Sequence, residues 1–192
     1  GLSVYALPAF STDEKSAYSV AVGEGKSLDF ITKSPDPHST IEGMLIELGN
    51  FYDFLTYTCN KNKTFDGKIL SSIVSLHEIP EFTYDELVKR ARRIDVIWFS
   101  KKPKHIFPKY IYEVEHSTDF TNSMIKMFQL KEFDARFILT SWQSRREIFY
   151  DRLGQEPFDQ VKTKFIFRPF ELIAELYFSA VRHFELQAKY FE

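Results

Sequence analysis

Two segments decide the fold of this chain: Arg93-Ile94-Asp95-Val96-Ile97-Trp98-Phe99 and, after a basic turn, Tyr110-Ile111-Tyr112-Glu113-Val114-Glu115. β-Branched and aromatic residues fill both segments and prolines interrupt the connection, so the pattern predicts two strands of a hairpin. Side chains of a strand alternate between its faces, so Glu113 and Glu115 point the same way. The return of the hairpin brings Asp95 beside them.

Three carboxylates at the end of an apolar sheet repel one another and lose hydration. A hard divalent cation resolves both problems, and ligands that are all oxygen favour Mg²⁺ or Mn²⁺. The alternative is a pair of exposed glutamates on an edge strand. The apolar residues around Glu113 and Glu115 favour the metal site.

Asp95, followed on the next strand by Glu113-Val114-Glu115, resembles the metal site of the PD-(D/E)xK nuclease superfamily, which has the restriction-endonuclease-like fold. The separation of 18 positions between Asp95 and Glu113 suits the hairpin of that family. The family usually has lysine where this chain has Glu115, although some restriction enzymes of the fold carry glutamate there. The order of elements extends the resemblance over residues 38–180.

The resemblance implies a Mg²⁺-dependent DNA endonuclease of restriction type, with Mn²⁺ as an alternative ion and a homodimer left open. Asp95 and Glu113 would bind one or two ions, with the backbone carbonyl of Val114 as a further ligand. Glu115 would accept a proton from water or bind a second ion, unless Lys126 replaces the usual lysine. The alternative function is a catalytically impaired nucleic-acid-binding or assembly module of the same fold, which the missing lysine favours. A sugar- or acyl-processing enzyme has no supporting feature.

Helices on either side of the hairpin offer further candidate catalytic residues. In nucleases of this fold a glutamate of the first helix often joins the metal site, and Glu42 fits that role better than Glu47 by its distance from the next strand. Lys126 and Gln129 of the following helix could supplement the motif. The alternative for all of them is a solvated helix surface.

Basic residues before and after the first strand are candidates for DNA binding. Arg92 and Arg93 end a helix, where they also suit the helix dipole. Lys101, Lys102 and Lys104 make the hairpin turn strongly basic, and we expect this turn to lie beside the metal site, where it would suit a phosphodiester substrate. The alternative explanation is that these lysines keep an exposed turn soluble and prevent aggregation through the neighbouring strands.

Composition indicates one ordinary globular domain of 192 residues, with 44 % hydrophobic and 17 % aromatic residues. The net charge of −2 requires any nucleic-acid contact to come from local basic patches. One cysteine, no signal peptide and no apolar run of membrane length predict a cytoplasmic protein without a membrane partner. A chain that begins at Gly1 without Met is typical of a fragment or of a residue left by cloning.

The remaining pattern predicts an α/β fold, with a mixed central sheet flanked by helices and a restriction-endonuclease-like core. We expect residues 1–37 to be an N-terminal extension or linker, with a hairpin over 18–22 and 28–31, and residues 38–192 to form the nuclease-like domain. The expected helices cover 39–54, 83–93, 121–131, 142–152 and 171–189, with a cap at Ser39 or Thr40. The other expected strands cover 54–59, 135–140 and 164–167, while 69–76 fits either a strand or a helix.

Overall fold

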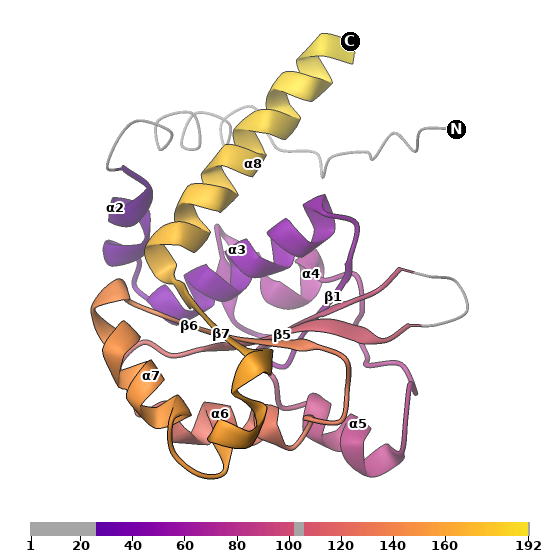
Figure 1. Cartoon of the computed structure of the whole chain (residues 1–192). Helices are drawn as coiled ribbons and strands as arrows, with labels where there is room; N and C mark the ends of the chain where they lie inside the picture. Colours follow the sequence, from indigo (N-terminus) through magenta and orange to yellow (C-terminus); the bar gives the residue numbers. More distant parts are fainter. Residues whose placement is uncertain (1–25, 102–105, 192) are drawn as a thin grey trace.

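A five-stranded mixed sheet lies between two layers of helices in the computed structural model, which describes residues 26–101 and 106–191 (Figure 1). The strand order is β1-β4-β5-β6-β7, with the first two pairings antiparallel and the last two parallel. The fold is therefore α/β and compatible with a restriction-endonuclease-like core, as predicted. The strands are β1 (Leu55–Thr58), β4 (Val96–Phe99), β5 (Pro108–Val114), β6 (Arg136–Ser141) and β7 (Phe165–Pro169).

Helices cover both faces of the sheet (Figure 1). One layer contains α2 (Lys26–Thr32), α3 (Pro37–Phe51), α4 (Leu70–Ile73) and α8 (Phe170–Phe191). The other contains α5 (Asp85–Ala91), α6 (Thr121–Phe128) and α7 (Arg146–Leu153). Two 3₁₀ helices, Gln143–Arg145 and Phe158–Lys164, and a small hairpin of β2 (Thr64–Phe65) and β3 (Lys68–Ile69) complete the described elements.

Alternation along the central strands gives the molecule two hydrophobic cores. Val96 and Tyr112 pack with α3 and α8, whereas Ile97 and Ile111 pack on the opposite face with α5 and α6. Both cores include residues of β4 and β5, so side chains from either helical layer can reach the ends of these strands. The candidate site lies at one of these ends.

The expected strand over 28–31 is wrong, because these residues belong to α2. A short apolar run suits a buried helix as well as a strand, and here Phe30 packs edge-on against Phe178 of α8, with 5.6 Å between ring centroids. Ile31 is fully buried in the core of α3 and α8. Residues 18–22 lie outside the described part of the chain. The division at residue 37 stays a prediction.

Helix α3 begins and ends earlier than predicted. Its N-cap is Asp36, whose carboxylate accepts the backbone N–H of Ser39 at 3.1 Å, and Pro37 occupies the first turn, where its missing N–H costs nothing. The chain reverses after Phe51, with a positive φ of 62° at Asp53. The earlier start places His38 on the helix, one turn before Glu42.

The other expected elements are present with ends shifted by a few residues, including all five remaining strands and the long C-terminal helix. The ambiguous segment 69–76 contains the end of β3 and then α4. None of the described helices is long and apolar enough to cross a membrane.

Candidate metal centre

Asp95 and Glu113 face each other at the end of the central hairpin. Val96 pairs with Tyr112 in the antiparallel register of β4 and β5, so Asp95, one residue earlier, lies across from Glu113. The Asp95 carboxylate accepts the backbone N–H of Val114 at 2.9 Å. This hydrogen bond fixes the Asp95 carboxylate against the C-terminal end of β5.

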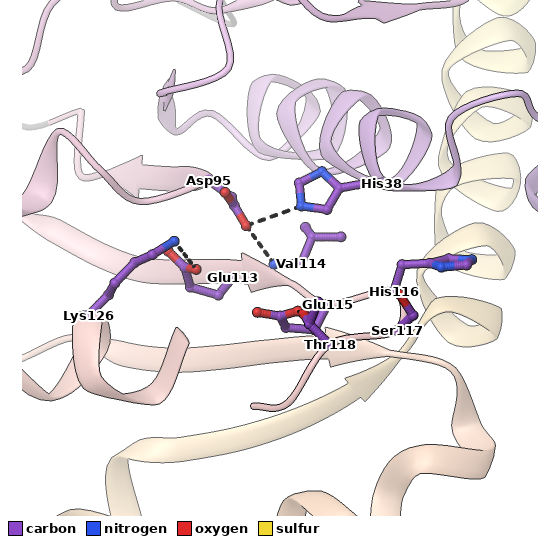
Figure 2. Close-up of a pocket in the computed structure, with 9 residues that line it drawn as sticks. All are labelled: His38, Asp95, Glu113, Val114, Glu115, His116, Ser117, Thr118 and Lys126. Atoms are coloured by element: carbon purple, nitrogen blue, oxygen red, sulfur yellow. Dashed lines mark hydrogen bonds and ion pairs between the residues drawn. The ribbon is translucent and has the colours of Figure 1, made fainter. Parts of the chain in front are cut away.

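A pocket of about 300 Å³ opens at this point (Figure 2). It receives side chains from α3, α6 and the hairpin, and also from the turn that follows β5. Its lining consists of His38, Asp95, Glu113, Val114, Glu115, His116, Ser117, Thr118 and Lys126. The predicted residues Asp95, Glu113, Val114, Glu115 and Lys126 are therefore brought together.

Glu113 is fully buried and is held from α6. Its Oε2 accepts hydrogen bonds from Lys126 Nζ at 2.7 Å and Ser123 Oγ at 3.0 Å, whereas Oε1 has no hydrogen-bond donor among the described residues. Burial, followed by the charge of Asp95, raises the pKa of Glu113 to about 8. Burial alone would lower the pKa of Lys126, but the Glu113 carboxylate outweighs it and raises that pKa.

Glu115 follows β5 and shares one partner with Glu113. The hydroxyls of Ser123 and Thr118 donate to its carboxylate. Ser123 therefore lies between two carboxylates while carrying a single hydroxyl proton. The backbone carbonyl of Glu115 is anchored by Ser141 Oγ at 2.5 Å and by Arg145 Nη1 at 3.4 Å, which holds this side of the pocket against the next strand.

Helix α3 supplies His38 and Glu42 from the other layer. His38 Nε2 lies 3.6 Å from Asp95 Oδ2, and Nδ1 lies 3.5 Å from Glu42 Oε2. Burial alone would lower the pKa of His38, but its two acidic partners raise it to about 10. Burial also raises the pKa of Glu42. Without a metal ion, a proton on His38 thus supplies positive charge to two buried carboxyl groups, and an ion bound to the ring would displace that proton.

The donor set of this pocket fits a divalent cation. Ligand atoms of His38, Glu42 and Asp95 all lie within 4.8 Å of one another. Glu42 Oε2 and Glu113 Oε1 are buried, and neither accepts a hydrogen bond within residues 26–101 and 106–191. Buried carboxylate oxygens without donors are costly unless a cation satisfies them.

Residues 21–191 match the family described as the C-terminal domain of the type II restriction enzyme NmeDI. The chain belongs to this family. No curated protein and no solved structure gives a significant match. The match covers the whole sheet, both helical layers and every residue of the pocket.

Two polar residues after β1 complete the surroundings of the acids in this restriction-enzyme domain. Asn60 Nδ2 donates to Glu42 Oε1 at 2.5 Å and lies 3.4 Å from Asp95 Oδ1. Cys59 Sγ lies 3.9 Å from the same Asp95 oxygen. Burial, followed by the charge of Asp95, raises the pKa of Cys59 to about 12, so the thiol stays neutral rather than serving as a thiolate ligand.

Glu42 and Glu47 are not solvated, so the alternative of an exposed helix surface does not hold for them. Glu42 is fully buried beside the pocket, and Glu47 is 6 % exposed in the core, where Tyr177 Oη donates to it at 2.5 Å. Both are buried because α3 is covered on nearly all sides by the sheet, α2 and α8. Gln129 is exposed at the end of α6 and does not line the pocket.

The basic candidates lie away from the pocket or outside the described residues. Lys101 follows β4 at the end of the hairpin opposite Asp95, and its Nζ lies 2.6 Å from Asp53 Oδ1. The expectation that this turn lies beside the acids is wrong, because the antiparallel register separates them by the length of the strands. Arg92 and Arg93 are exposed after α5. Lys102 and Lys104 lie outside the described residues.

Sequence reasoning missed His38, Asn60 and Ser123. The sequence Asp36-Pro37 is a helix start that would have placed His38 on the helix, one turn before Glu42. Ser123 and Lys126 share a face of α6 by their spacing of three. Asn60 carried no signal beyond its place in a polar turn.

Proposed function

We propose that this chain is a metal-dependent endodeoxyribonuclease of restriction type, which hydrolyses phosphodiester bonds of DNA. The observation that carries the proposal is the juxtaposition of Asp95 and Glu113 across the hairpin, with a buried Glu113 oxygen that has no donor among the described residues. The family match supports DNA as the partner and a role in restriction. The resemblance to the nuclease superfamily implies Mg²⁺, with Mn²⁺ as the alternative ion.

Asp95 and Glu113 would hold the ion, together with the backbone carbonyl of Val114. When bound, such an ion polarises the scissile phosphate, activates water and stabilises the leaving oxygen. The Val114 N–H keeps one Asp95 oxygen in place, and Ser123 and Lys126 keep one Glu113 oxygen in place. Glu113 therefore retains Oε1 for a ligand role, and Asp95 would offer Oδ1, which has only long contacts to Asn60 and Cys59.

Lys126 and Glu115 are the two candidates for handling the attacking water. Lys126 projects its ammonium into the pocket from α6 and can stabilise developing negative charge. Glu115 stands at the position where the family usually has lysine, and its carboxylate can accept a proton. We favour Lys126 as the replacement for the usual lysine, because Glu115 is already engaged by two hydroxyls.

DNA would approach over the open side of the pocket, and we propose Arg92, Arg93, Lys101, Lys102 and Lys104 as phosphate contacts outside the pocket. The near-neutral net charge makes such local contacts necessary. Two copies related by a two-fold axis would offer one pocket to each strand of a duplex. The oligomeric state and its link to double-strand cleavage can be measured by sedimentation with and without DNA.

The test of this function is cleavage of supercoiled plasmid and of labelled duplexes by the purified chain. Cleavage is expected with Mg²⁺ or Mn²⁺ and not with EDTA. Single-stranded DNA and RNA, tried under the same conditions, define the substrate class. Absence of cleavage with both ions on every substrate would reject the nuclease assignment.

A catalytically silent DNA-binding or assembly module of a restriction enzyme is the second candidate. The observation that favours it is Glu115 at the usual lysine position, with both of its oxygens engaged. A module of this kind would retain DNA in a gel-shift assay without cleaving it. Its binding would not require a divalent ion.

A further inference from the structure

His38 differs from the other candidate ligands because it offers nitrogen. Its ring lies between two acids that come from different elements, Glu42 from α3 and Asp95 from the segment before β4. The distances of 3.5 and 3.6 Å from its nitrogens to the carboxylate oxygens exceed the usual range for N–H···O hydrogen bonds. Neither contact therefore locks the ring in place.

Contacts from other segments orient both acids near the ring, and the Asp95 oxygen nearest the ring, Oδ2, is the one that accepts the Val114 N–H. Asn60 holds Glu42 by Oε1, and Oε2 is buried without a hydrogen-bond donor in the described part of the chain. The Val114 N–H, from the opposite strand, orients the Asp95 carboxylate. Supporting contacts of this kind are what orient ligands in metal sites.

We propose that His38 is a direct ligand of the ion, which makes this a mixed nitrogen and oxygen centre for a first-row transition ion such as Mn²⁺ or Co²⁺ in preference to Mg²⁺. Mg²⁺ selects oxygen ligands and retains its water, whereas transition ions accept imidazole together with carboxylate. The inference deepens the proposed function and rests on it only for the presence of an ion at Asp95. It concerns binding, so it can hold or fail independently of DNA cleavage.

The imidazole also explains a placement that an all-oxygen site would not need. A carboxylate dyad of Asp95 and Glu113 uses the hairpin alone, but His38 brings the N-terminal turn of α3 to the same pocket, with Glu42 in contact behind it. One turn of helix separates the two residues, so they present their ends side by side. A single ion could contact both and Asp95, because the three ligand atoms lie within 4.8 Å of one another.

The experiment measures Mn²⁺ and Mg²⁺ binding to the DNA-free chain by calorimetry, for wild type, His38→Gln and His183→Gln. His183 is an exposed histidine of α8 and controls for adventitious surface binding. Pulsed EPR of the Mn²⁺-loaded chain reports directly whether a ¹⁴N nucleus is coordinated. Circular dichroism of each variant verifies folding, which we expect to persist because His38 is partly exposed.

Wild type should bind Mn²⁺ more tightly than Mg²⁺ and show a coordinated ¹⁴N signal. Loss of even an outer-shell partner typically costs about 10–100-fold in metal affinity, so His38→Gln should weaken Mn²⁺ binding at least about tenfold and abolish the ¹⁴N signal. Mg²⁺ affinity should change little, and His183→Gln should behave as wild type. A wild type without Mn²⁺ binding or without ¹⁴N coupling would overturn the proposal. Unchanged or tighter Mn²⁺ binding by His38→Gln would also overturn the proposal, because the imidazole would then not be a ligand of the ion.

Discussion

Glu42 and Glu47 lie on the same helix, and both are buried, but their surroundings differ. Glu47 faces the core and accepts a hydrogen bond from Tyr177, so its carboxyl group is satisfied within the protein. Glu42 lies next to His38 of the pocket, and its Oε2, 3.5 Å from His38 Nδ1, accepts no hydrogen bond from the described residues. Burial raises the pKa of both groups. We therefore expect an oxygen without a hydrogen-bond donor beside a pocket, rather than burial or a raised pKa, to distinguish a functional acid from a structural one.

The largest expected effect is on cleavage, and it should distinguish Asp95 of the pocket from Glu47 of the core. Asp95→Asn should reduce cleavage by about 10⁴-fold or more, the scale found when a residue essential to the chemistry is removed. The fold should persist, because asparagine retains an oxygen for the Val114 N–H and removes a like charge beside Glu113. Glu47→Gln should cleave as wild type. Single-turnover assays and thermal melts test both variants, and equal activity of Asp95→Asn and wild type would remove Asp95 from the mechanism.

The next effect distinguishes two pocket residues from each other. If Lys126 replaces the usual lysine, Lys126→Met should slow the cleavage step by about 10²–10⁴-fold, and Glu115→Gln should have a mild effect. If Glu115 acts as the base, the order reverses. The assay is single-turnover cleavage at saturating Mg²⁺, which removes differences in metal affinity. Glu115→Lys restores the commoner family pattern and is a useful third variant.

A smaller effect concerns stability on the core side. Tyr177→Phe should destabilise the fold by about 1–3 kcal/mol, because it leaves a buried Glu47 oxygen without its donor. Cleavage per folded molecule should not change. The matched pocket variant, Glu42→Gln, should have the opposite profile, with metal-free stability retained and metal affinity reduced. Urea unfolding and calorimetry would refute the distinction if the two variants behaved alike.

The pH dependence of the metal-free chain gives the most subtle test. The folded-state pKa of Glu113 is raised from 4.5 to about 8, so its contribution to stability is fully present below pH 4.5 and is lost as the pH rises through 8. The raised pKa of His38 has the same sign and extends the loss from about pH 6.5 to 10. In EDTA, the urea midpoint of wild type should therefore fall with rising pH. Glu113→Gln should fall less between pH 5 and 8, and Mg²⁺ should reverse the trend because the ion binds the deprotonated carboxylate. A wild-type midpoint that rises over this interval would contradict the assignment.

The central hairpin could be predicted from sequence because its information is local. Branched and aromatic residues define β4 and β5, and the antiparallel return then places Asp95 opposite Glu113. The contribution of α3 could not be predicted in the same way. A helix thought to start at Ser39 leaves His38 outside it, and only the Asp36 cap and Pro37 reveal the true start.

Other errors arose where short segments carry two signals. Residues 28–31 fit a strand by composition, but packing of Phe30 and Ile31 against α3 and α8 stabilises a helix. The basic turn near Lys101 was placed beside the acids by sequence proximity, whereas pairing register puts it at the far end of the hairpin. The roles of Asn60 and Ser123 depend on contacts between distant segments, which a single sequence does not encode legibly.

The pocket takes His38 from the layer above the sheet and Lys126 from the layer below it (Figure 2). Its geometry consequently depends on the alignment of three layers whose two cores are packed by separate sets of side chains. A displacement of about 1 Å at reacting groups can cost about 10²-fold in rate. A substitution deep in either core, remote from every acid, could therefore shift the helices that carry the pocket residues. Cleavage activity would then decline while the chain remained folded.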